Sequence, residues 1–154
     1  TLLDENHLKE LGIVNNLYNV KMSIHSAHKE TYAKIIRNGE FYYDRLMQNI
    51  HYLSELRKKY HFGMTLLFVT TALNYQDIPD FIRLAENLNA VWFVSEYSDE
   101  QLQSCEKHPE WVITNKNHPE YKNLVKVLHD KVFNEISNNN LSEVLKQIQQ
   151  ENID

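Results

Sequence analysis

The sequence is poor in the residues that form disulfides, metal–sulfur centres and sharp turns. Its 154 residues include one cysteine, Cys105, three glycines and three prolines. A single cysteine excludes a disulfide framework and a cysteine-built zinc or iron–sulfur site within this chain, and we interpret Cys105 as an inert thiol. The few glycines and prolines leave no low-complexity linker, so we expect a continuous run of secondary structure.

Long apolar runs and excess basic charge are also missing. No stretch approaches the roughly 20 apolar residues of a membrane helix, and the polar first residues do not resemble a signal peptide, so we expect no membrane association. Sixteen Lys and Arg against 21 Asp and Glu give a net charge of -5, which argues against nucleic-acid binding. With 42% hydrophobic residues, the composition is typical of a folded domain, and the lone cysteine fits a reducing cytoplasm.

The apolar residues alternate between strand and helix spacing. Residues 18–24 and 90–95 predict strands, and the apolar run 64–69 is typical of a strand buried on both faces. Helices are predicted around them, at 4–12, 41–60, 76–87, from 98, at 118–132 and at 141–150. This order predicts right-handed crossovers between parallel strands, so the expected fold class is α/β.

Individual residues in these elements carry further predictions. We expect Asp77 to cap the helix at 76–87, and Asn140 with Glu143 to form a capping box for the last helix. The aromatic residues Trp92 and Phe93 of the third strand are expected in the core rather than on a stacking surface.

Three strands are few for an all-parallel sheet. Such a sheet would leave two apolar edges unpaired, which soluble proteins avoid. We therefore expect the chain to be the middle or C-terminal part of a larger sheet, completed by a further segment or by a partner.

The carboxyl ends of the predicted strands carry polar residues, and active sites of parallel α/β folds lie at this edge. The residues that we expect to share the edge are Ser23, His25, Ser26, His28 and Arg37, then Thr70, Thr71 and Asn74, then Ser95, Glu96 and Tyr97.

Each of these residues also has a plainer interpretation. Ser23 would equally cap the turn after its strand, and Arg37 would be either a surface charge or an anion ligand. His25 and His28 are more typical of a hydrogen-bonded loop pair than of a metal site. Because no glycine-rich phosphate loop, nucleophile elbow or zinc motif is present, spacing alone leaves the function open.

The stretch from Val20 to Tyr60, VKMSIHSAHKETYAKIIRNGEFYYDRLMQNIHYLSELRKKY, resembles the fourth strand and following helix of radical S-adenosylmethionine (radical SAM) enzymes. The matching positions are Ser23-Ile24, Ala27, Lys29-Glu30-Thr31-Tyr32, Lys34-Ile35, Arg37, Gly39, Phe41, Asn49-Ile50 and Leu53 to Lys58. Residues 66–93 are similar to the family's fifth strand, its Asn-containing loop, fifth helix and sixth strand. The opening, TLLDENHLKELG, looks like the segment after strand three.

The resemblance implies a partial (β/α)6 barrel, with residues 1–97 as its C-terminal half and 98–154 as a helical C-terminal extension. In this family a CxxxCxxC loop after strand one binds a [4Fe–4S] cluster, which reduces SAM to start radical chemistry. That cysteine triad is absent here, so we expect this chain alone to bind neither cofactor and to need the missing N-terminal half of the barrel. His25-Ser26 replaces the Asp-Gly of many relatives, which argues against the peptide-modifying subgroup.

The resemblance also implies roles for individual residues. Ser23 and Arg37 match the positions that hold the methionyl carboxylate of SAM, a group that suits a guanidinium. The positions near the nucleoside are Val69, Thr70 and Asn74, and the expected substrate rim is His25, Ser26 and Glu96. The substrate itself is not indicated.

Two other hypotheses remain at this point. One is a degenerate, non-catalytic half-barrel that binds a ligand or a protein, which an upstream CxxxCxxC motif would exclude. The other is an unrelated phosphate-binding α/β barrel, which predicts an anion between Ser23 and Arg37 and no affinity for SAM.

Overall fold

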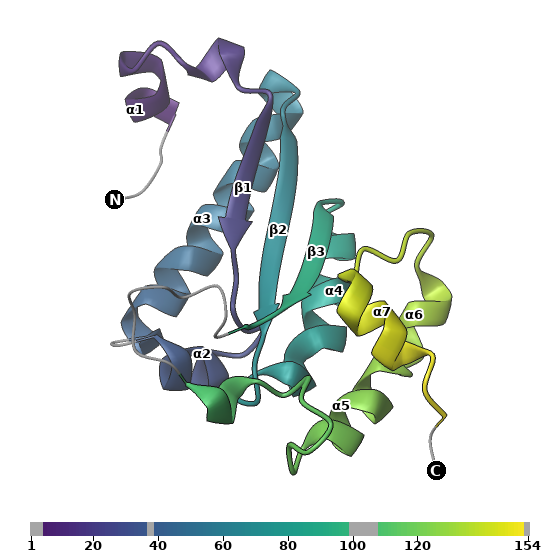
Figure 1. Cartoon of the computed structure of the whole chain (residues 1–154). Coiled ribbons are helices and arrows are strands. Elements are labelled where there is room, and N and C mark those ends of the chain that lie inside the picture. The colour runs from purple at the N-terminus through teal and green to yellow at the C-terminus, as the bar shows by residue number, and fades with distance from the viewer. Residues whose placement is uncertain (1–4, 37–38, 99–107, 153–154) are drawn as a thin grey trace.

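The centre of the molecule is a sheet of three parallel strands in the order β1-β2-β3 (Figure 1). The computed structural model describes residues 5–36, 39–98 and 108–152. The strands are β1 (Asn19–Ser23), β2 (Gly63–Thr70) and β3 (Val91–Glu96). The mixed α/β class, the three strands and their parallel direction are therefore confirmed.

The helices agree with the predicted pattern between the strands and differ from it in the C-terminal part. They are α1 (Glu5–Glu10), η1 (Val14–Asn16), α2 (Lys29–Ile35), α3 (Gly39–Tyr60), η2 (Tyr75–Asp77), α4 (Ile78–Asn87), η4 (Pro109–Trp111), α5 (Tyr121–Leu128), α6 (Val132–Glu135) and α7 (Glu143–Gln149). Within the described residues, none of these helices is long and apolar enough to cross a membrane.

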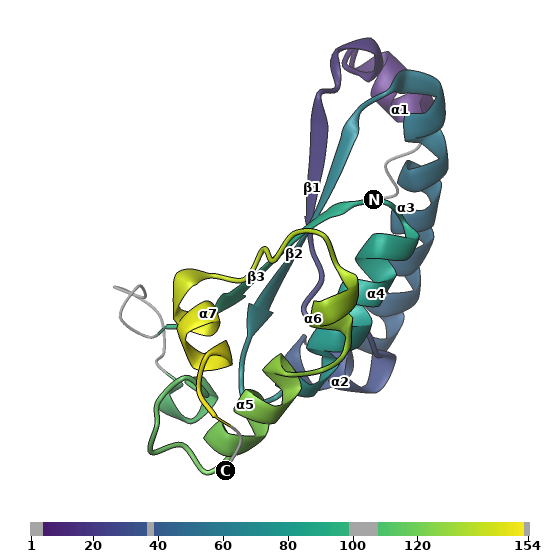
Figure 2. The same cartoon turned by 90° about the vertical axis from the view of Figure 1, so that its right-hand side faces the viewer.

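One face of the sheet is covered by α3 and α4, and we call it the covered face (Figure 2). Successive side chains of a strand point to opposite faces, so the strand register assigns each residue to one of them. Met64, Leu66 and Phe68 of β2 form the covered face together with Trp92 and Val94 of β3, and all five are buried. This face contains the apolar core that stabilises the sheet.

The opposite face, which we call the open face, is much less buried. Val91 and Phe93 of β3 are 52% and 47% exposed there. Leu67 and Val69 of β2 are half-buried beside them. The expectation that Phe93 lies in the core is wrong, because strand alternation places Phe93 opposite the buried Trp92.

The two edges of the sheet also differ. Leu141 forms a single parallel bridge to Val94, in which Val94 N–H donates to Asn140 O and Ser142 N–H donates to Val94 O. This short contact covers part of the β3 edge. Among the described residues no strand pairs with the outer edge of β1, so its backbone groups stay open to a further strand.

The same contact changes the start of the last helix. Because residues 140–142 run along β3, α7 begins only at Glu143, and its N-cap is Ser142, whose hydroxyl accepts from Leu145 N–H. The predicted Asn140 cap is therefore wrong. Asp77 also makes no side-chain cap for α4, because its carboxylate is bonded elsewhere.

The predicted helix at 118–132 is divided into α5 and α6. Asp130 lies between them, and its Oδ1 accepts from Val132 N–H at 2.9 Å. This local bond satisfies the backbone N–H of the first residue of α6 and favours the break. Its other partner is Arg83 of α4, whose Nη2 donates to the same oxygen at 2.8 Å.

The α2–α3 connection depends on a glycine. A Cβ atom on Gly39 would lie 2.6 Å from Ala33 Cα and 2.8 Å from Tyr32 O. Any side chain would therefore force α3 away from α2. Gly39 thus has a packing reason to occupy this position, independent of any ligand.

Candidate functional site

The carboxyl ends of the three strands lie at one edge of the sheet, next to α2 and η4 (Figure 1). Backbone bonds hold the three ends together: Ile24 N–H donates to Leu67 O at 2.8 Å, and Tyr97 N–H donates to Thr70 O at 2.9 Å. The structure therefore brings the predicted polar residues of the described segments to a common edge, and the parallel sheet is the reason.

Asn74 ties the loops of this edge to one another. Its Nδ2 donates to His25 O at 2.8 Å and to Val69 O at 2.9 Å, and its Oδ1 accepts from Thr71 N–H at 2.7 Å and from Thr71 Oγ1 at 3.1 Å. The side chain is 1% exposed. In this arrangement Asn74 positions the backbone of two strand ends, and a ligand would compete with bonds already formed.

Ser26 and Asp77 form a second, fully internal connection. The Ser26 hydroxyl donates to the Asp77 carboxylate and accepts from His28 N–H at 2.9 Å, and Ser26 has no exposed surface. This bond fixes the loop after β1 on the start of α4. It also explains why Asp77 does not cap its own helix.

His28 continues this connection at the surface. Its Nε2 lies 2.9 Å from Asp80 Oδ2, and Arg83 pairs with both Asp80 and Asp130 at 2.8 Å. Partial burial of the Asp80 carboxylate raises its pKa, but the hydrogen bonds from His28 and Arg83 together outweigh this effect, so the pKa of Asp80 is lowered. These contacts link the β1 loop to α4 and to the α5–α6 junction.

The residues assigned to SAM binding divide between the two faces of the sheet. Ser23 lies on the open face at the end of β1 and is exposed, and Val69 is half-buried on the same face. Thr70 lies on the covered face, 1% exposed. Its Oγ1 is buried and has no hydrogen-bond partner in the described part of the chain.

Two of the expected rim residues are partly engaged by other segments. Glu96 accepts a hydrogen bond from the Ser142 hydroxyl, which joins the end of β3 to the start of α7. His25 is half-buried, and this burial lowers its pKa. Arg37 and Cys105 lie outside the described residues, as do residues 99–101 of the helix predicted from 98.

An aromatic cluster at this edge was missed by the sequence analysis. The rings of Trp111 and His108 are stacked with centroids 4.2 Å apart, and Tyr97 contacts Trp111 edge-on at 5.9 Å. Trp111 O accepts from Ala72 N–H at 3.1 Å, which holds η4 against the end of β2. Residues 108–111 carry no helical or strand periodicity, so no sequence signal indicated this contact.

The described residues contain no group of three His, Cys, Asp or Glu side chains arranged to hold a metal ion. Comparisons with protein-family models, with curated proteins and with solved structures find no match to this chain. The geometry of the site and the sequence resemblance are therefore the basis for a functional proposal.

Burial of His25 predicts a pH dependence of stability. Because its pKa is lower in the folded chain than the ordinary 6.5, the unfolded chain binds more protons between these two pKa values. The free energy of unfolding should therefore fall as the pH decreases through this range, and the loss should be complete below the folded pKa. Urea unfolding of the wild type and of His25→Gln, at about pH 8 and about pH 5, measures this loss of stability. The variant should lose less stability than the wild type on acidification. Equal losses would contradict the prediction.

Proposed function

We propose that this chain is the C-terminal half of a radical SAM-type partial barrel, in which β1, β2 and β3 are strands four to six. The observation that carries the proposal is the resemblance over residues 20–60, which spans one strand, β1, and its crossover helices α2 and α3. The parallel sheet with strands in sequence order supports it, since a (β/α) barrel is wound in that way.

The open edge and the open face give this proposal its geometry. Strand three of the missing N-terminal half would pair with the outer edge of β1 and continue the sheet toward strands two and one. The open face, with Phe93 and Val91, would then become the interior of the barrel. Such pairing would remove the unpaired strand edge, which is otherwise a site for aggregation.

The described residues fit S-adenosylmethionine in part. Ser23 is exposed on the prospective interior face at the carboxyl end of β1, and its hydroxyl has no partner among the described residues. Val69 follows on β2 on the same face. Both suit direct contact, whereas Thr70 and Asn74 would act by holding the strand ends in place.

The iron–sulfur cluster does not fit this chain alone, because one cysteine is too few to hold it. In the proposed enzyme the cluster would be bound by cysteines of the N-terminal half. When bound, it supplies the electron that cleaves SAM. The residues of this chain would bind and orient SAM and the substrate, and would exclude water from the carboxyl edge.

A non-catalytic module is the second candidate. It is favoured by the open β1 edge and by the exposed Val91 and Phe93. These surfaces would suit a protein partner whether or not the complete protein binds an iron–sulfur cluster. It predicts that the complete protein has no cysteine triad and does not cleave SAM.

The complete reading frame, purified without oxygen and supplied with iron and sulfide, tests the two candidates. A radical SAM enzyme should show the broad absorption of a [4Fe–4S] cluster at about 400 nm, and it should release 5′-deoxyadenosine on reduction. Neither signal, together with no upstream CxxxCxxC motif, would overturn the enzyme proposal and leave the binding module.

The two residues assigned to the SAM carboxylate give a quantitative prediction. In the complete protein, Arg37→Ala should weaken SAM binding by roughly 1.5–3 kcal/mol, the scale of a lost charge-assisted hydrogen bond. Ser23→Ala should weaken it by about 1.5 kcal/mol, the lower end of the range for a hydrogen bond to a charged group, since the Ser23 donor is itself uncharged. Equilibrium binding of SAM measures both, with Ser137→Ala, at an exposed position between α6 and α7, as the control. An unchanged dissociation constant in Arg37→Ala would contradict its assignment.

A further inference from the structure

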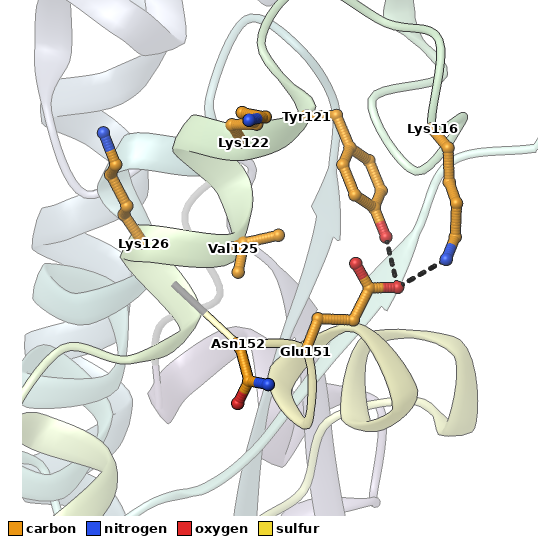
Figure 3. A pocket seen from close by; sticks show the side chains of 7 residues that line it. All are labelled: Lys116, Tyr121, Lys122, Val125, Lys126, Glu151 and Asn152. Atoms are coloured by element: carbon orange, nitrogen blue, oxygen red, sulfur yellow. Dashed lines mark hydrogen bonds and ion pairs between the residues drawn. The ribbon is translucent and has the colours of Figure 1, made fainter. Parts of the chain in front are cut away.

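A cavity of about 290 Å³ lies between α5, the loop before it and the segment after α7 (Figure 3). It is lined by Lys116, Tyr121, Lys122, Val125, Lys126, Glu151 and Asn152. The volume is near the lower end of the range for small-molecule sites, which is roughly 300–1,000 Å³.

The charges around this cavity are unbalanced. Its carboxylate, Glu151, is already engaged: Lys116 Nζ lies 2.7 Å from Glu151 Oε1, and the Tyr121 hydroxyl donates to the same oxygen at 2.9 Å (Figure 3). These two bonds lower the pKa of Glu151, so it is ionised at neutral pH. Lys122 and Lys126 have no carboxylate partner within the described residues, and the cavity keeps an excess of positive charge.

The position of these two lysines on α5 points to an external anion. Lys122 and Lys126 are four residues apart, so they lie one turn apart on the same side of the helix. Like charges at this spacing destabilise an isolated helix slightly, and a bound anion would reverse that repulsion. The excess of lysines here is notable because the whole chain has a net charge of -5.

The cavity also has apolar atoms next to the lysines, which would favour an organic anion. Tyr121 and Val125 are largely buried in the core, and the small part of each that stays exposed contributes to the lining. In Figure 3 the side chain of Val125 lies between Lys126 and the Tyr121–Glu151 pair, and Lys122 lies above it. We propose that this cavity binds a small organic anion. Its phosphate or carboxylate would be held by Lys122 and Lys126, and its apolar body would lie against Val125 and the Tyr121 ring. The proposal is independent of the radical SAM assignment.

An NMR titration of the chain with phenyl phosphate, benzoate and inorganic phosphate tests the proposal. Phenyl phosphate or benzoate should shift amide signals of α5 and of residues 116 and 151–152, and whichever binds more tightly identifies the preferred anionic group. Lys122→Ala/Lys126→Ala should weaken that binding at least about tenfold, since two charge-assisted contacts are lost. Lys131→Ala, an exposed lysine outside the cavity, is the control and should leave the affinity unchanged.

A second variant keeps the test informative if the double variant folds poorly. Glu151→Gln removes the negative charge of the cavity and releases Lys116, so it should tighten the binding of the preferred anion by about threefold or more. Equal affinity in wild type and both variants would overturn the proposal. So would inorganic phosphate binding as tightly as both aromatic anions, because the apolar wall would then contribute nothing.

Discussion

Replacing Asn74 by alanine should lower the free energy of unfolding by about 3–5 kcal/mol, although the residue lies in a loop. The expected loss is large because one buried side chain satisfies several backbone groups. Without it, His25 O, Val69 O and Thr71 N–H would lose a partner in a position that is almost closed to water. Each buried polar group left without a partner costs about 1–3 kcal/mol.

Urea unfolding followed by circular dichroism measures this loss. Asn134→Ala is the matched control, since Asn134 of α6 is exposed, and its replacement should change stability by less than about 0.5 kcal/mol. Asn74→Asp should also destabilise the chain, because it keeps the acceptor toward Thr71 but loses both donors to the carbonyls. If Asn74→Ala unfolded at the same urea concentration as the wild type, the hydrogen bonds of Asn74 would not stabilise the strand ends.

The elements around the sheet could be predicted because their patterns are local. The apolar run of β2 predicts a strand, although the expected burial on both faces is wrong because Leu67 and Val69 are only half-buried on the open face. The spacing of Leu46, Ile50 and Leu53 predicts the long helix α3. Such patterns follow from the 3.6-residue and two-residue periods of helix and strand. They also predicted correctly that the strands are parallel, since each connection contains a helix.

The errors arose where a distant contact decides a local structure. The start of α7 depends on the contact of Leu141 with β3, and the role of Asp77 depends on Ser26, which is 51 residues away. The wrong assignment of Phe93 has another cause. A short apolar strand does not reveal which of its faces is covered, and only the packing of α3 and α4 decides between Trp92 and Phe93.

In the candidate site, too, the positions of the residues could be predicted from the sequence, whereas their contacts could not. Parallel strands bring their carboxyl ends together, so the edge that contains Ser23, Thr70 and Glu96 could be predicted. The hydrogen bonds of each side chain could not be predicted, because a resemblance assigns residues to positions and does not show their contacts. Asn74 matches a position near the nucleoside, yet in this chain its amide is bonded to protein atoms. Its proposed contribution to binding is therefore to position the loop.

Phe81→Ala should lower the free energy of unfolding by about 3–5 kcal/mol, the range for removing a large buried aromatic side chain. Phe81 of α4 has no exposed surface, and its ring centroid lies 5.0 Å from that of Phe68 on β2. The variant would leave a cavity between α4 and the covered face, where the rigid sheet limits collapse. Urea unfolding of the chain measures the loss, and a change below about 1 kcal/mol would contradict this packing.

Phe93→Ala is the matched control, because it removes the same side chain from the open face. On this chain it should lower the free energy of unfolding by only about 1 kcal/mol, since Phe93 is 47% exposed and about half of the burial free energy of the ring is at stake. In a complete barrel the same substitution would lie in the interior, where burial of an aromatic ring stabilises by about 1.5–3 kcal/mol. A loss of that size in the complete protein, together with a small one in this chain, would support a covered interior face. Equal small losses in both would favour a sheet whose second face stays open.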